Sequence, residues 1–254
     1  MSTGRKIIIG NWKMNPLTTR EAKKEFFAIK KIASGINKAK VVICPPFIFL
    51  ENLAKNSKSE NFSIGAQDLY WEESGSFTGE ISPRMLYYLG IKYSIVGHSE
   101  KRAFGETNEM TNLKIKACLK NKIIPILCVG ERERDENHEY LTFIKKEIEE
   151  GLKGFSKNMF SKLIIAYEPI WAIGKNAKRQ AIPEEFLEMS IFIRRVLSDM
   201  FGVKNISSLR IVYGGSVNHK NAKDFLENGG ADGLLVGRDS LDSKKFGEIL
   251  KSVK

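Results

Sequence analysis

Hydrophobic and polar positions alternate along this chain in a unit that occurs eight times. Each unit starts with a short apolar run typical of a buried strand, passes through a Gly, Pro or polar turn, and ends in an amphipathic helical segment. The predicted strands are residues 6–12, 40–45, 62–67, 92–97, 123–129, 162–168, 209–213 and 232–236. The predicted helices lie at about 17–33, 48–56, 82–89, 108–121, 137–153, 183–201, 219–228 and 243–251.

The order of these elements predicts an α/β fold. Because the connections are helical and right-handed crossovers dominate, eight units favour a closed parallel (β/α)8 barrel over an open sheet. A chain of 254 residues with 42% hydrophobic content could form one large domain or two small ones. The seven prolines and 21 glycines are spread without a linker-like cluster, so we expect a single domain over residues 1–254.

The cysteines and the N-terminus bear on the compartment. The cysteine count is odd and there is no C-x-x-C pair, which argues against a disulfide framework or a zinc site and for a reducing compartment. The three histidines lack metal-ligand spacing, so we expect no metal site. No cofactor is expected either. The first residues lack an apolar signal core, and no apolar run approaches the ~18 residues of a membrane span. A soluble cytoplasmic protein without membrane binding is therefore expected. The cysteines are Cys44, Cys118 and Cys128.

The chain is basic, with 41 Lys and Arg against 30 Asp and Glu, a net charge of +11. Such a balance is compatible with nucleic acid, with an anionic small substrate, or with a Lys-rich proteome. The basic residues are interleaved with acids along the helical segments, as at 144–150, and no aromatic and basic stripe occurs. This pattern favours solvated helix faces over a nucleic-acid surface.

The sixth predicted strand ends in one carboxylate, Glu168, followed by an apolar flap at 170–173. Pro169 ends the strand by removing a hydrogen-bond donor, and Gly174 supplies a permissive backbone after the flap. An acid beside a possible lid suggests a proton-transfer site that excludes water. The same stretch also fits an ordinary exposed Glu before a loop, because strand-end acids are common in this architecture.

Other strand ends carry further polar groups. In a parallel barrel they meet at one face, where functional residues are expected. An amide, an ammonium, an imidazole, a carboxylate and two Gly-containing turns would converge there. The segments are 10–15 with Asn11 and Lys13, 97–100 with His98, Glu168, 213–218, and 235–238 with Arg238.

Four of these segments match motifs of the triosephosphate isomerase family, which the chain resembles over essentially its whole length. The motifs are Gly-Asn-Trp-Lys-Met-Asn at 10–15, Gly-His-Ser-Glu at 97–100, Ala-Tyr-Glu-Pro-Ile-Trp-Ala-Ile-Gly at 166–174 and Tyr-Gly-Gly-Ser-Val at 213–217. Any one motif is a weak signal, but four in order at the right strand ends are specific. The resemblance implies a TIM barrel that interconverts dihydroxyacetone phosphate and glyceraldehyde 3-phosphate through an enediolate.

By the same resemblance, Glu168 is the base that moves the carbon proton, and His98 donates to the carbonyl oxygen and shuttles protons. Lys13 and Asn11 would stabilise the enediolate and the phosphate, and Glu100 would pair with Lys13 and hold it charged. The residues alone leave other readings open. A lone His after an apolar strand is often a satisfied core residue. A strand-end Lys can also be a surface charge or a Schiff-base nucleophile.

The family's phosphate site implies backbone N–H groups from four positions: Gly174, Ser216, Gly237 and Arg238. Tyr213 and Ser216 would bond the closed lid. The Gly-Gly pair of this turn, taken alone, indicates only a turn.

The segment around 68–82 resembles the long loop that inserts into a partner subunit in this family. Its Trp71 and Phe77 lie outside any clear core pattern, which favours a partner over a free loop. A homodimer is implied, in which Thr78 supports the neighbour's Lys13 and His98. Cys128 is interpreted as packing, since no His lies beside it in sequence.

The chain departs from the family in the lid, in the turn after the eighth strand, and at Lys101, which replaces the first of a usual Arg pair. The lid after Gly174 continues through residues 175–181 and is about two residues longer, which predicts an altered opening rate with intact chemistry. Arg238 stands where a second glycine is usual, so its N–H serves only if its φ tolerates a Cβ. Rival functions are a barrel aldolase or epimerase, which would need a Schiff-base Lys or a metal cluster, and a surface-binding scaffold.

Overall fold

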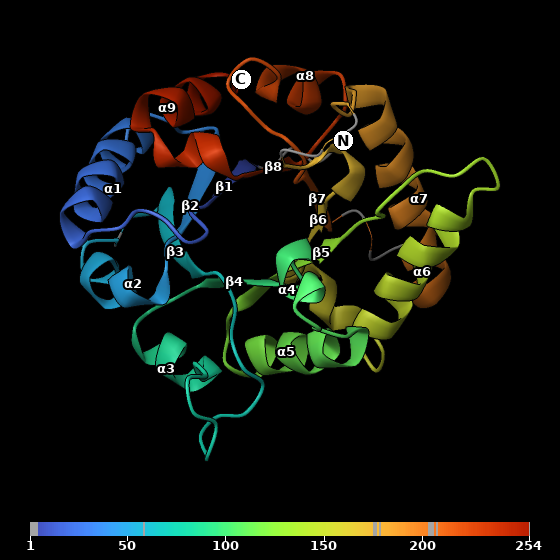
Figure 1. The fold of residues 1–254 in the computed structure, drawn as a ribbon, viewed down its shortest axis with the longest axis horizontal. Coiled ribbons are helices and arrows are strands. Elements are labelled where there is room, and N and C mark those ends of the chain that lie inside the picture. Colours follow the sequence, from blue (N-terminus) through green and yellow to red (C-terminus); the bar gives the residue numbers. More distant parts are fainter. Residues whose placement is uncertain are drawn as a thin grey trace.

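Eight parallel strands close into a barrel in the computed structural model, which describes residues 5–57, 59–174, 177, 179–202, 206 and 208–253 (Figure 1). Neighbouring strands follow the chain order, and β1 pairs with β8 to close the ring. All eight predicted strands are confirmed, with ends that differ by at most two residues. The strands are β1 (Lys6–Asn11), β2 (Ala39–Cys44), β3 (Phe62–Ala66), β4 (Tyr93–Val96), β5 (Ile124–Val129), β6 (Ile164–Tyr167), β7 (Arg210–Tyr213) and β8 (Gly233–Val236).

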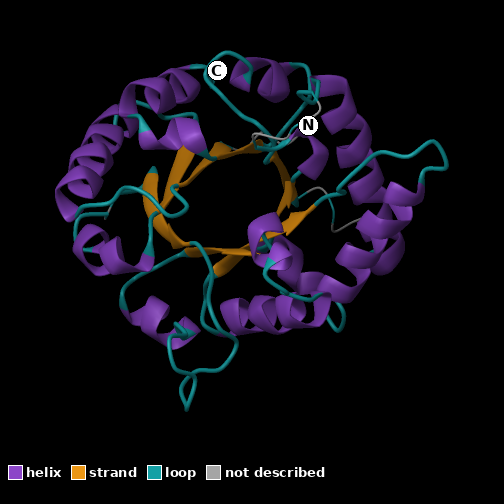
Figure 2. Ribbon diagram, viewed as in Figure 1, coloured by secondary structure: helices purple, strands orange, loops and turns teal. Residues whose placement is uncertain are grey.

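Most helices form an outer ring around the strands, and the short helix after β4 lies inside this ring (Figures 1 and 2). The helices are α1 (Thr19–Ala33), α2 (Phe47–Ala54), α3 (Pro83–Tyr88), α4 (Ser99–Ala103), α5 (Asn108–Lys120), α6 (Glu139–Gly151), α7 (Pro183–Phe201), α8 (Ala222–Glu227) and α9 (Ser243–Lys251). The described residues also form the 3-10 turns η1 (Lys157–Lys162), η2 (Ile170–Ala172) and η4 (Arg238–Leu241). None of the helices within the described ranges is long and apolar enough to cross a membrane.

Local sequence explains where the helices begin. Thr18 accepts a hydrogen bond from the Glu21 N–H while the Glu21 side chain bonds back to Thr18, and this capping box starts α1. The helix predicted at 219–228 begins later, at Ala222. Asn218 and Asn221 bond each other's backbone N–H groups and hold the preceding residues as a turn.

The apolar strands are buried on both faces, as their continuous hydrophobic runs predict. Side chains such as Ile9, Val42 and Cys128 fill the barrel interior. Alternate side chains such as Ile8 and Leu127 pack against the helices in a second, larger cluster. Two buried layers therefore fix the strands, and the chain after each strand emerges at one end of the barrel.

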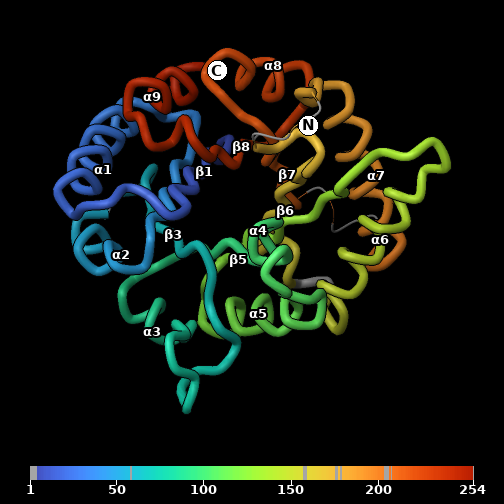
Figure 3. The backbone as a smooth tube through the Cα atoms, viewed as in Figure 1, coloured from blue at the N-terminus to red at the C-terminus, as the bar shows by residue number. Residues whose placement is uncertain are grey.

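The loop between β3 and α3 projects away from the barrel (Figures 1 and 3). Tyr70 stacks on Trp71 with ring centroids 4.0 Å apart, and Phe77 lies 4.7 Å from Tyr70. The sequence interpretation placed Trp71 outside the core, but its side chain is partly buried against the main core. Phe77 is 40% exposed, so only the outer part of the loop presents an uncovered aromatic ring.

Candidate active site

Glu168 lies directly after β6 and is only 2% exposed. Its backbone N–H donates to Val129 O at 2.8 Å, which continues the ladder one residue past the strand. Two glycines on neighbouring strand ends let the backbone close around it. A Cβ on Gly130 would stand 1.8 Å from the Glu168 carbonyl oxygen, and one on Gly214 would stand 2.9 Å from its Cγ. The carboxylate is therefore held in a space that only glycine neighbours leave open.

His98 follows β4 and faces this carboxylate, with Nε2 3.2 Å from Glu168 Oε1. As the N-cap of α4, His98 accepts the Glu100 N–H at its Nδ1, at 3.1 Å. A ring nitrogen that accepts a hydrogen bond carries no proton, so Nε2 carries the N–H of a neutral imidazole. The Ser99 N–H donates to Glu168 Oε2 at 3.3 Å. In this geometry the carboxylate is bonded by His98 on one oxygen and by Ser99 on the other.

Lys13 stands after β1 with a left-handed φ of 52°. Such a backbone is unfavourable for a residue with a side chain, by about 1 kcal/mol or more. Three hydrogen bonds support it: Asn11 Oδ1 accepts the Lys13 N–H at 3.0 Å, and Gln67 Nε2 donates to the carbonyls of Lys13 and Cys44. The Lys13 ammonium meets Glu100 Oε1 at 2.6 Å, as predicted. This contact engages the Lys13 Nζ with a carboxylate instead of leaving it free to attack a carbonyl as a Schiff-base nucleophile.

The turns after β7 and β8 lie on the same rim. Ser216 donates its hydroxyl to Ala172 O at 2.6 Å and so contacts the flap. A Cβ on Gly237 would lie 3.8 Å from Lys13 Cε, which places this turn beside the ammonium. Arg238 begins η4 and is absent from the residues with positive φ, so its backbone accommodates a Cβ. Position 174 favours glycine, because its φ of 82° lies in the left-handed region.

Two further positions were predicted to support the site. The Tyr213 ring is buried and stacked 3.7 Å from the Phe225 ring, and its hydroxyl lies under Gly215, where an added Cβ would be 2.2 Å away. Thr78 is exposed in the β3–α3 loop. In the longer lid, positions 175, 176 and 178 lie outside the described residues.

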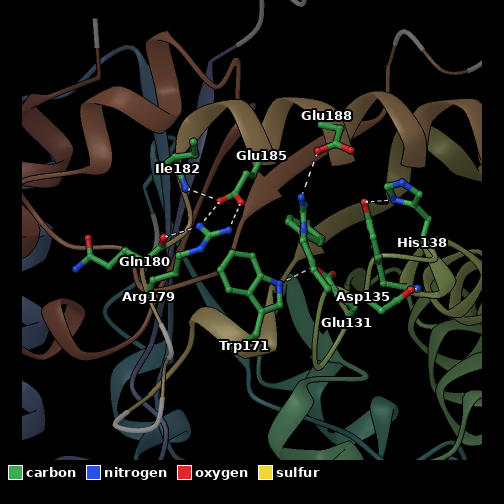
Figure 4. A network of polar contacts seen from close by, with 12 residues as sticks. Glu131, Asp135, His138, Trp171, Arg179, Gln180, Ile182, Glu185 and Glu188 are labelled. Carbon is green, nitrogen blue, oxygen red and sulfur yellow. Dashed lines mark hydrogen bonds and ion pairs between the residues drawn. The ribbon is translucent and has the colours of Figure 1, made fainter.

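A buried anchor for the flap was missed by the sequence interpretation (Figure 4). Glu131 is 1% exposed, and its Oε1 accepts Trp171 Nε1 at 2.7 Å and the Tyr167 hydroxyl at 2.8 Å. Arg134 Nε lies 3.3 Å from the same oxygen. Burial raises the pKa of Tyr167 well above its usual range, so the phenol stays a donor. The strand-end rule could have indicated Glu131, because it follows β5 by two residues.

Arg179 reaches the flap from its other end. Its guanidinium carbon lies 4.5 Å from the centre of the Trp171 ring, a cation–π distance, and its Nη2 pairs with Glu185 Oε1 at 2.5 Å (Figure 4). The sequence placed Arg179 in the lengthened segment but assigned it no contact. Trp171 is thus held by Glu131 at its indole N–H and by Arg179 over its face.

Cys128 is fully buried within the barrel. Burial, followed by the nearby charge of Glu168, raises the pKa of its thiol well above the usual value. A thiol that stays protonated is a poor nucleophile. The structure therefore supports packing as the role of Cys128.

Comparison with known proteins identifies the family. The family model described as triosephosphate isomerase matches residues 6–253. Triosephosphate isomerase of Dictyoglomus thermophilum is 44% identical over 98% of this chain and 99% of its own length. The Moorella thermoacetica protein of the same name is 41% identical over 97% of this chain and 98% of its own. The crystal structure of triosephosphate isomerase from Bartonella henselae superimposes with a TM-score of 0.83 at 30% identity, covering 98% of both chains. This chain therefore belongs to the triosephosphate isomerase family and is an isomerase.

Proposed function

We propose that Glu168 is the base that interconverts dihydroxyacetone phosphate and D-glyceraldehyde 3-phosphate by moving one proton between adjacent carbons through an enediolate. The observation that carries this proposal is the buried contact between Glu168 Oε1 and His98 Nε2, 3.2 Å apart. It joins a base and a hydrogen-bond donor from two strand ends. A proton beside a carbonyl is a poor acid in water, so both groups must act at once.

The substrate would replace the contacts that now hold the carboxylate. Glu168 is bonded by His98 and by the Ser99 N–H, so binding requires it to turn from these donors toward the substrate carbon. The His98 Nε2–H would then be free to donate to the carbonyl oxygen. Because the imidazole is neutral, it can return a proton to either enediolate oxygen in turn.

Positive charge and backbone N–H groups would bind the enediolate and the phosphate of the substrate. Lys13 places an ammonium beside the Gly237 turn, and Asn11 supplies a neutral donor next to it. Gly174, Ser216, Gly237 and Arg238 would offer backbone N–H groups to the phosphate. These donors are aligned before the reaction, so they stabilise developing charge without reorganising.

We further propose a homodimer through the loop around 68–82. A pocket of about 310 Å³ beside Asn11 and Gln67 is walled by Gly79, Ile81 and Lys101. Large apolar side chains are uncovered in the segments after β1 and α4, among them Met14 (89% exposed), Leu17 (86%) and Phe104 (88%). Apolar side chains exposed to this degree favour a covering partner, and the partner's Thr78 would then approach Lys13. The enzyme would act in cytoplasmic glycolysis and gluconeogenesis, which both pass through this interconversion.

The test is turnover of glyceraldehyde 3-phosphate by the purified protein beside a Glu168→Asp variant. Withdrawing the carboxylate by one methylene, about 1 Å, should lower kcat by about 100-fold or more. Glu149→Asp makes the same change on an exposed face of α6 and should leave kcat as it was. Absence of turnover in the unmodified protein, or equal kcat in both variants, would refute the assignment of Glu168. Trapping of a Lys13 adduct by borohydride would instead support a Schiff-base aldolase.

A further inference from the structure

Asp239 is a buried carboxylate that the proposed mechanism does not use. It lies in η4, one residue after Arg238. Its Oδ2 accepts the backbone N–H of His219 at 3.1 Å and faces His219 Nδ1 at 3.0 Å. His219 lies 20 residues before Asp239 in the chain, in the turn after β7. One carboxylate oxygen therefore joins the β7 turn to the β8 turn.

The strands that lead into these two turns pair over a short stretch. Strands β7 and β8 are neighbours in the barrel wall, but their pairing covers only Val212 with Gly233 and Tyr213 with Leu234. The chain beyond these pairs carries Ser216 on one side and Gly237 with Arg238 on the other. Asp239 makes its bonds to His219 beyond the end of the ladder, so it replaces the missing pairing with a side-chain link.

Each turn is rigid on its own. In the β7 turn, Asn221 Nδ2 donates to Ser216 O at 3.0 Å, and Asn218 Oδ1 accepts the Asn221 N–H. In the β8 turn, the Ser240 hydroxyl donates to Gly237 O at 2.7 Å, and Trp12 Nε1 donates to Ser240 O at 2.9 Å. The spacing between two rigid turns then depends on what links them.

We propose that Asp239, through His219, is a positioning residue for the phosphate of the substrate. It sets the distance between the N–H of Ser216 and the N–H groups of Gly237 and Arg238, which must point at one dianion. This inference rests on the proposed function, because it needs a phosphate between these turns. A carboxylate near an anion site is electrostatically unfavourable, so its presence there is explained by the two hydrogen bonds it accepts.

The test compares KM with kcat in the full-length protein, with glyceraldehyde 3-phosphate as substrate and inorganic phosphate as competitive inhibitor. Asp239→Ala should raise KM and the phosphate inhibition constant about tenfold each, with kcat within about threefold. Asp239→Asn keeps an oxygen that can accept both bonds and should stay within about twofold of the unmodified protein. Asp242→Ala is the matched control, since Asp242 lies in the same segment but its side chain accepts the N–H groups of Lys244 and Lys245 and so caps α9.

Several results would overturn the proposal. One is an Asp239→Ala enzyme whose KM and phosphate inhibition constant match those of Asp242→Ala. Another is an Asp239→Asn enzyme as impaired as Asp239→Ala, which would assign the effect to charge. If Asp239→Ala does not fold, His219→Ala removes only the side-chain bond and should raise KM about threefold, while an unchanged KM would count against the link. An unmodified protein without turnover would instead contradict the proposed function itself.

Discussion

Gly130→Ala tests whether the backbone contact around Glu168 sets the catalytic geometry. The added Cβ would lie 1.8 Å from the Glu168 carbonyl oxygen and 2.5 Å from its carbonyl carbon. Real Cβ contacts stay beyond 3.0 Å. The clash is with backbone on a neighbouring strand end, so a rotamer change cannot relieve it. Either Gly130 or Glu168 must shift by about 1.2 Å to restore a normal contact, a larger move than well-packed interiors absorb freely.

The shift should act on rate more than on stability. Glu168 must reach the substrate carbon while His98, whose Nε2 lies 3.2 Å from it, donates to the carbonyl oxygen, so a shift of about 1 Å misplaces the base relative to both groups. A misplacement of this size costs about 100-fold in rate, so kcat should fall to about one hundredth of its original value. Overpacking should lower the free energy of unfolding by about 1–3 kcal/mol, which a domain of this size can tolerate.

The assay is steady-state turnover of glyceraldehyde 3-phosphate, with circular dichroism and urea unfolding to confirm the fold. Gly151→Ala is the matched control, because its Cβ would meet Leu127 Cδ2 at 3.8 Å, an ordinary contact. Gly214→Ala, with 2.9 Å to the flexible Glu168 Cγ, should give an intermediate loss. A folded Gly130→Ala enzyme with kcat within threefold of the control would refute this reasoning.

Three further predictions concern buried groups. Burial raises the pKa of Glu147 from 4.5 to about 7, so the folded state binds the carboxyl proton more tightly than the unfolded state. The free energy of unfolding that this binding contributes is fully present below pH 4.5 and is lost as the pH rises through 7. Glu147→Gln should flatten that decline by on the order of 3 kcal/mol in urea unfolding across this range, and an unchanged slope would contradict the burial argument. The Lys114 side chain is 6% exposed and lies between Asp68 and Glu106. Lys114→Met should therefore lower the free energy of unfolding by about 3–5 kcal/mol, whereas Lys120→Met, at an exposed ion pair, should change it by under about 1 kcal/mol. Similar losses in the two variants would contradict this prediction. Burial also raises the pKa of the three buried thiols, which belong to Cys44, Cys118 and Cys128. None of them should therefore react with Ellman's reagent before the protein unfolds, and a thiol that reacts fast in the native protein would show the burial to be wrong.

The barrel could be predicted because its strands are apolar on both faces and its helices on one. Those periodicities depend only on residue type and spacing, so they survive without coordinates. Parallel strands bring their carboxyl ends to one rim, which is why Glu168 and His98 could be expected to meet. The orientation of the His98 ring could not be predicted, because it depends on a Glu100 N–H that is free only at a helix start.

The partners of the charged residues inside the fold could not be predicted from the sequence pattern. Lys114 on α5 looks like a solvated helix position, yet it is buried between Asp68 and Glu106. Glu131 could have been indicated by its place after β5, but its role as the buried anchor of Trp171 depends on a partner 40 residues away in the chain. Such sites are defined by partners far away in the chain, and periodicity carries no information about them.

Hydrogen exchange at carbon tests the central claim most directly. In D2O, an enzyme that moves a carbon proton through a carboxylate should incorporate deuterium into dihydroxyacetone phosphate at the carbon beside the carbonyl, followed by proton NMR. We predict incorporation by the unmodified protein and by the exposed control Glu149→Gln, and a rate about 1,000-fold lower for Glu168→Gln, which keeps the shape of the side chain but cannot accept the proton. Exchange by Glu168→Gln at the rate of the unmodified protein would contradict the account.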